Sequence, residues 1–77
     1  MAEIHRADVT LHVDETLEKE TRENLEKDLL SLNGVADVSS SKKAPHLMIV
    51  SYDPRLVRSK DILGVVRGDH LRAELIG

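Results

Sequence analysis

The sequence predicts an α+β domain in which two helices cover one face of a four-stranded antiparallel sheet. Three observations predict it: segments of alternating apolar and polar residues, two stretches with apolar residues at helical spacing, and turn residues between them. They place the elements in the order β-α-β-β-α-β. Two interleaved right-handed crossovers then give a ferredoxin-like sandwich with the strand order 4-1-3-2.

The first strand and the first helix are expected within residues 9–32. Residues 9–13 alternate apolar with polar side chains, as a half-buried strand does. Asp14 or Thr16 then offers a side chain that is able to cap the following helix. The inner face of this helix is a line of leucines at helical spacing, Leu25, Leu29 and Leu32.

The middle of the chain reads as two strands joined by a hairpin. Asn33-Gly34 is typical of a helix that ends with a left-handed glycine. A second strand is expected from Val35, a hairpin loop at residues 39–45, and a third strand at residues 47–52. Because both faces of the third strand carry apolar residues, we expect it in the centre of the sheet.

The last helix and strand complete the second half. Asp53-Pro54 ends the third strand, and Ser59 is the expected cap of a helix with the inner face Ile62, Val65 and Val66. Residues 71–75 alternate again and predict the fourth strand. The predicted core contains Leu11, Val13, Leu25, Leu29, Leu32, Val50, Tyr52, Ile62, Val66 and Ala73.

Length, charge and cysteine content exclude several classes. A chain of 77 residues closes one core, so we expect a single domain at 1–77, with residues 1–7 loosely ordered. A net charge of −3 without a basic cluster disfavours nucleic-acid binding. No apolar run approaches the ~20 residues that span a bilayer, and the polar N-terminus lacks a secretory signal. These features predict a soluble, cytoplasmic protein with no membrane partner.

The chain resembles the heavy-metal-associated domain of copper chaperones and metal-pumping ATPases. The resemblance rests on the first strand at residues 9–13, on Asn33-Gly34-Val35, and on the strand ending at residues 50–54. The placement of three apolar residues completes it: Ile62, Val66 and Ala73. It implies the sandwich described above and, in ordinary members, metal carried by the loop after the first strand.

That loop has lost its thiols in this chain. The resemblance aligns the family's Gly-Met-x-Cys-x-x-Cys loop so that Glu15 and Thr16 replace glycine and methionine, while Glu18 and Thr21 replace the two cysteines. The whole sequence contains no cysteine. Carboxylates and hydroxyls do not select Cu(I) as thiolates do. We therefore expect no thiolate exchange of Cu(I) or Zn(II), and no resident cofactor.

A harder metal ion, bound at the end of the domain that carries this loop, is the open alternative. The resemblance brings Glu18 close to Asp69 and His70, which precede the last strand. Carboxylates with one imidazole suit a divalent ion such as Zn(II), Ni(II) or Mn(II). Acidic residues in a first helical turn also stabilise the helix dipole, so their presence alone does not establish a ligand set.

No catalytic arrangement is found, and we expect a protein that is not an enzyme. The serine run at residues 39–41 has no adjacent base. Acylphosphatase shares the predicted topology, but it needs an arginine in a phosphate-binding loop after the first strand, where this chain is acidic. Amino-acid-binding domains of the ACT type share it too, but they use a glycine in that loop.

Two functions from different classes follow. The first is a protein-interaction or regulatory module that binds a protein partner, or a second copy of itself, through the helix-free face of the sheet. On that face His12, Leu47 and Ile49 form a small apolar centre with polar surroundings. The second is a carrier for a harder divalent ion in metal homeostasis, at Glu18, Asp69 and His70.

Overall fold

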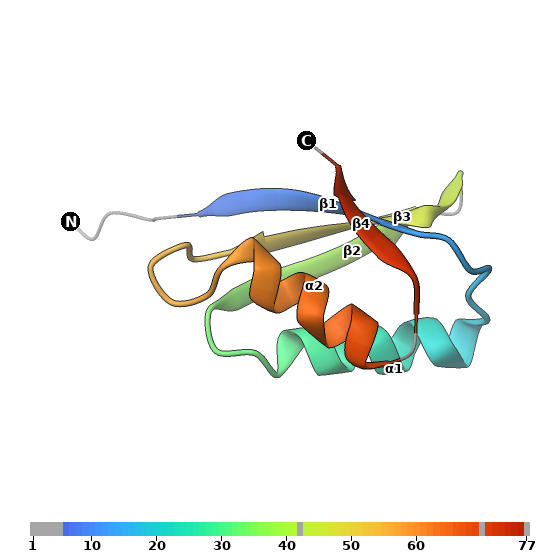
Figure 1. Ribbon diagram of the computed structural model, residues 1–77, viewed down its shortest axis with the longest axis horizontal. Coiled ribbons are helices and arrows are strands. Elements are labelled where there is room, and N and C mark those ends of the chain that lie inside the picture. The colour runs from blue at the N-terminus through green and yellow to red at the C-terminus, as the bar shows by residue number, and fades with distance from the viewer. Residues whose placement is uncertain (1–5, 42, 70, 77) are drawn as a thin grey trace.

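The computed structural model describes residues 6–41, 43–69 and 71–76 of the chain. It confirms the predicted order of elements and the sandwich of one sheet and one helical layer (Figure 1). The elements are β1 (Ala7–Val13), α1 (Lys19–Leu30), β2 (Val35–Ser41), β3 (Ala44–Tyr52), α2 (Ser59–Gly68) and β4 (Ala73–Ile76). Both helices lie on the same side of the sheet.

The sheet has four strands in the order β2-β3-β1-β4, which is the predicted order read from the other edge. All pairs are antiparallel, and β3 lies in the centre between β2 and β1. In the register Leu11 faces Met48 across β1 and β3, and Val13 faces Ala73 across β1 and β4. These four side chains are buried, so they define the face of the sheet on which the helices pack.

The core agrees closely with the prediction. Eight of the ten predicted residues are buried, while Leu32 and Tyr52 are partly buried and pack against the others. Leu17 and Val57 are core residues that the sequence did not indicate. They lie just before α1 and α2, outside any periodic segment, so no hydrophobic repeat marks them. Burial of apolar side chains from both layers holds the sandwich together.

Five strand boundaries differ from the prediction. Ala7 belongs to β1 and pairs with Tyr52, although it was expected in a loose segment; residues 1–5 lie outside the described part. The hairpin loop is shorter than residues 39–45, because β2 continues to Ser41 and β3 starts at Ala44. β4 spans Ala73–Ile76 rather than residues 71–75. In each case the strand ends where its backbone pairing with the neighbouring strand ends, and not where its apolar pattern ends.

The predicted helix caps are wrong. The N-cap of α1 is Glu18, and no side chain caps this end, whereas Asp14 contacts His12 instead. Ser59 is the first residue of α2 rather than its cap. The Asp61 carboxylate accepts a hydrogen bond from the Arg58 backbone N–H at 3.1 Å and so satisfies this helix start. Neither described helix is long and apolar enough to cross a membrane.

The turn between α1 and β2 packs against the connection between β3 and α2. Gly34 has φ = +108°, a conformation that side chains disfavour. Its carbonyl accepts a hydrogen bond of 2.7 Å from the N–H of Asp53. The Asp53 carboxylate in turn accepts hydrogen bonds from Nε and Nη2 of Arg55 at 3.1 and 2.9 Å. Side-chain hydrogen bonding to Asp53 is the main cause of the raised pKa of Arg55, and desolvation by burial acts to lower that pKa.

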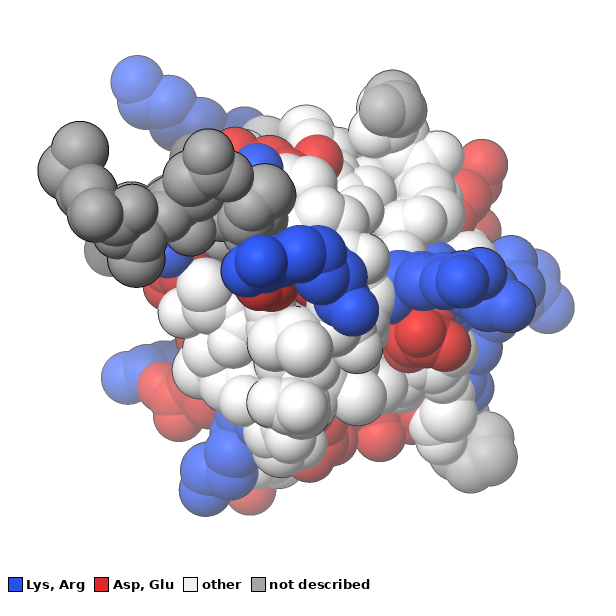
Figure 2. Space-filling model, turned by 90° about the vertical axis from the view of Figure 1, so that its left-hand side faces the viewer, with Lys and Arg blue, Asp and Glu red and all other residues white. Residues whose placement is uncertain are grey.

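Figure 2 views the end of the molecule that carries this β3–α2 connection. Basic and acidic side chains are interspersed there around an uncharged surface, rather than gathered by sign. Such a surface is not the basic patch that binds a phosphate backbone. The candidate sites described below lie elsewhere in the described part of the chain.

Candidate functional site

The helix-free face of the sheet carries the predicted interaction residues. Residues that alternate with the buried ones point to this face, so His12 lies beside Leu47 and Thr10 lies beside Ile49. Ile49 is 46% exposed, and His12 and Leu47 are half-buried. The alternation read from the sequence therefore placed all three residues on the correct face.

A hollow of about 330 Å³ lies on this face. The residues that line it come from β1, β2 and β3: Thr10, Ser39, Ser40, Ala44, Leu47 and Ile49. Ile76 is also 46% exposed and pairs with Thr10 from the other side. Ile76 was not predicted on this face, because the fourth strand was expected to end at residue 75.

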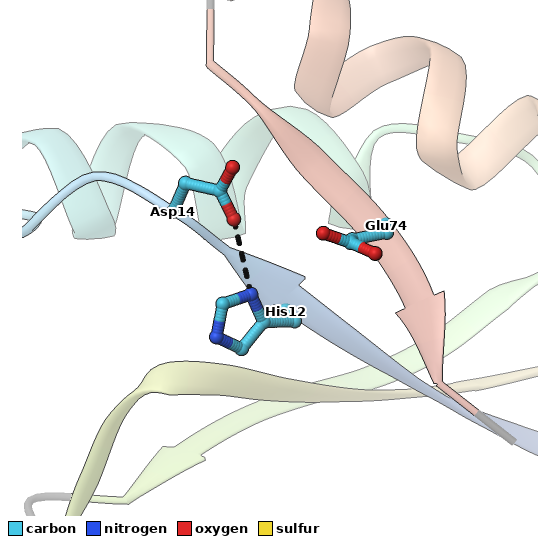
Figure 3. A group of neighbouring side chains, drawn as sticks. All are labelled: His12, Asp14 and Glu74. Carbon is cyan, nitrogen blue, oxygen red and sulfur yellow. Dashed lines mark hydrogen bonds and ion pairs between the residues drawn. The ribbon is translucent and has the colours of Figure 1, made fainter.

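Beside this apolar area, three potential metal ligands converge (Figure 3). His12 pairs with Glu74 across β1 and β4, and Asp14 follows His12 by two residues. One ligand atom from each residue lies within 4.8 Å of the other two. The sequence does not reveal this group, because Glu74 lies 62 positions after His12 and only the strand register joins them.

A second imidazole adjoins this group. The rings of His12 and His46 stack with their centroids 6.0 Å apart and an angle of 27° between the planes. His46 Nδ1 lies 2.9 Å from the carbonyl oxygen of Val13 and donates to it. On the other side, His12 Nδ1 lies 3.1 Å from Asp14 Oδ1. The His12 ring is thus held between a carboxylate and an imidazole.

The metal site that the resemblance suggested, at Glu18, Asp69 and His70, has its described residues in another part of the structure. Glu18 is exposed at the start of α1, and Asp69 is exposed at the end of α2. Thr21 and Asp69 line one hollow of about 440 Å³, so the segments that carry them are neighbours as expected. His70 lies outside the described residues. A site at Glu18, Asp69 and His70 therefore stays a prediction.

Backbone hydrogen bonds tie the first loop to the segment before β4. The N–H of Asp14 donates to the carbonyl of Arg72 at 2.8 Å. The N–H of Arg72 donates to both carboxylate oxygens of Glu15 at 2.9 Å. Glu15, which the resemblance places where the family has glycine, thus closes this loop through its side chain.

Comparison with known proteins identifies the fold. No protein-family model and no curated protein matches the chain, but solved structures do. The copper-binding domain of HMA7, a P-type ATPase, matches with a TM-score of 0.81 and 23% identity, over 91% of this chain and 93% of that domain. Oxidized MerP from Ralstonia metallidurans CH34 gives 0.82 and 14%, over 94% and 99%. The yeast copper transporter domain CCC2A gives 0.80 and 20%, over 91% and 94%.

These similarities show that the chain has the ferredoxin-like fold of heavy-metal-associated domains. They span nearly the whole of each neighbour, and two of the three neighbours are described as copper domains. In this chain Glu18 and Thr21 stand where the resemblance expects cysteines, and the sequence has no cysteine at all. The fold is therefore that of heavy-metal-associated domains, and the sequence offers no thiolate ligand.

Proposed function

We propose that this protein is an interaction module whose helix-free sheet face binds a second domain of its own kind, with a second copy of the chain as the occupant. The observation that carries the proposal is the exposed apolar area formed by Ile49 and Ile76 around Thr10, next to the 330 Å³ hollow. Exposed aliphatic residues beside a hollow on one face are typical of an interaction surface.

The shape of this face favours self-association. The hollow lies over β2 and β3, whereas Ile76 projects from β4 at the opposite edge of the sheet. In a face-to-face pair with a two-fold axis parallel to the strands, β4 of one copy lies over β2 of the other. Each Ile76 then meets the hollow of its partner, so the same contact forms twice, as in an isologous interface.

Polar pairs border the apolar area. At one end of β1, Ser51 Oγ donates a hydrogen bond of 2.6 Å to Asp8 Oδ1. At the other end, His12 contacts Asp14. An apolar centre with a polar surround matches the anatomy of protein interfaces. The area of one small sheet face lies at the low end for specific complexes, so we expect a weak dimer.

The test is sedimentation equilibrium of the purified chain at increasing concentration, up to the millimolar range. Wild type is expected to show a concentration-dependent dimer. Ile49→Lys and Ile76→Lys should each abolish it, because a lysine in the centre of the contact would be desolvated without a partner. Leu30→Lys is the matched control, since Leu30 is 50% exposed but lies on α1, in the other layer.

NMR shift mapping of the same samples locates the contact. Concentration-dependent shifts are expected on the helix-free face, around Thr10 and Ile49, and not on α1. A wild-type chain that stays monomeric at millimolar concentration would overturn the proposal. So would a dimer that Ile49→Lys leaves intact.

A further inference from the structure

The end of the sheet where β1 leaves β4 brings three side chains to one spot. His12 and Glu74 are direct partners in the β1–β4 ladder, so their side chains lie next to each other on the helix-free face. The N–H of Asp14 donates to the Arg72 carbonyl, which continues this ladder one step beyond Val13 and Ala73. Asp14 therefore keeps the strand alternation and lies on the same side as His12.

The charges of this group are unbalanced. Among the described residues, neither Asp14 nor Glu74 forms an ion pair with a lysine or arginine. The neighbouring carboxylate of Glu15 does have a partner, because it accepts the backbone N–H of Arg72. Two carboxylates without a lysine or arginine partner leave a local negative charge that a cation would neutralise.

From this geometry we propose that His12, Asp14 and Glu74 bind a divalent transition-metal ion of the Zn(II) type. One imidazole nitrogen and two carboxylate oxygens form a ligand set that suits Zn(II), and also Ni(II) or Mn(II), but not Cu(I). The site differs from the loop to which the resemblance assigns metal, and it uses neither Glu18 nor Thr21. It also does not depend on the proposed dimer, because all three ligands come from one chain.

The distances suit a site that closes on the ion. Ligands held at about 2.1 Å around a tetrahedral Zn(II) lie about 3.4 Å apart, compared with the 4.8 Å limit within which these atoms lie. The His12 and Asp14 side chains are 39% and 47% exposed, so both have solvent-facing space for the rotations that close this gap. Three protein ligands leave one position for water.

The surroundings of His12 prepare it for this role. A metal-binding imidazole usually has its other ring nitrogen or its ring plane held by neighbouring groups. Here the His46 ring stacks on the His12 ring with the centroids 6.0 Å apart, while Asp14, 3.1 Å from Nδ1, is itself one of the proposed ligands. His46 is itself fixed by its hydrogen bond of 2.9 Å to the Val13 carbonyl. A lone surface histidine would lack these contacts.

The experiment is a Zn(II) titration of the full chain, followed by calorimetry and by NMR of the imidazole nitrogens. We expect saturable binding of one ion per chain, with shifts of the His12 nitrogens and of the amides around Glu74. His12→Gln, Asp14→Asn and Glu74→Gln should each weaken binding at least about tenfold, the lower end of the loss caused by removing even an outer partner of a ligand.

Two controls make the result specific. Glu23→Gln removes an exposed carboxylate on α1 that is remote from the site, and it should leave the affinity unchanged. Glu18→Gln combined with His70→Gln removes the alternative metal site, and it should also leave the affinity unchanged. Circular dichroism of each variant verifies that the fold persists.

The same titration on Ile49→Lys separates this proposal from the proposed function. Retained Zn(II) binding by that variant would show that the site stands without the dimer. The metal proposal is overturned if no saturable binding occurs, if Asp14→Asn and Glu74→Gln bind like wild type, or if the Glu18→Gln and His70→Gln combination removes binding.

Discussion

A Cβ atom added to Gly34 would lie 2.9 Å from Cγ1 of Val57 and 2.8 Å from Cβ of Leu56. The turn after α1 is therefore pressed against the connection that leads into α2. Because Val57 is a core residue, this close approach couples the two halves of the sandwich at one point. The absence of a side chain at Gly34 is thus a requirement of packing as well as of backbone conformation.

Gly34→Ala is expected to lower the free energy of unfolding by roughly 1–3 kcal/mol, since alanine combines an unfavourable positive φ with a clash. Urea denaturation measures it. Gly64→Ala is the matched control, because nothing lies within 4 Å of a Cβ placed there. In the interior of α2 this change should raise stability by about 0.5–1 kcal/mol. Equal effects of the two substitutions would contradict the packing described for Gly34.

Leu29→Ala should cost about 2–5 kcal/mol, the range for truncating a leucine in a closed core. Leu29 is fully buried, whereas its neighbour Leu30 is 50% exposed. Leu30→Ala should therefore change stability by less than about 0.5 kcal/mol. Chemical denaturation of both variants checks the orientation of α1, and a larger loss for Leu30→Ala would show that the helix is rotated.

The chain is expected not to hold Cu(I) tightly. It has no cysteine, and the sulfur of Met48 belongs to a side chain that is 1% exposed in the core. Competition with a strong Cu(I) chelator should leave the protein without copper. Glu18→Cys combined with Thr21→Cys should restore retention of one ion per chain, since two thiolates then stand where the resemblance expects them. Retention of Cu(I) by the wild-type chain against the chelator would contradict this prediction.

Asp61→Ala should destabilise the protein by about 0.5–2 kcal/mol, the usual loss when a helix start loses its capping group. The carboxylate accepts the Arg58 N–H and also lies in the positive first turn of α2. Lys60→Ala, at an adjacent exposed position, serves as the control and should be near neutral. Thermal unfolding of the two variants compares them, and a loss as large for Lys60→Ala would rule out the capping role.

The N-terminal caps of the helices could not be predicted from local residue preferences. Ser59 is a favoured capping residue, and the sequence alone gave no reason to prefer Asp61 two positions later. In the structure α2 begins one residue earlier than a Ser59 cap requires, after the buried Val57, and this places Asp61 where it accepts the Arg58 N–H. Leu17 was missed for a similar reason, because it fills the core from a loop that has no periodicity.

The residues of the candidate sites were likewise only partly predictable from the sequence. Strand alternation placed His12, Leu47 and Ile49 on the helix-free face, since alternate side chains of a strand point to opposite faces. Alternation says nothing about which residue of another strand lies opposite. Alternation also put Glu74 on this face, but its direct pairing with His12, and the pairing of Ile76 with Thr10, came only from the β1–β4 register.

The sequence by itself determined the order of the elements, the strand order of the sheet and most of the core. Hydrophobic periodicity and turn residues are local signals, and few topologies satisfy them. It also determined the loss of thiolate chemistry, because a missing residue type needs no coordinates. Only the tertiary structure decided that His12, Asp14 and Glu74 meet, and that Ile76 faces the same side as Ile49. Contacts between distant segments depend on register and loop geometry, which are settled by packing the whole chain.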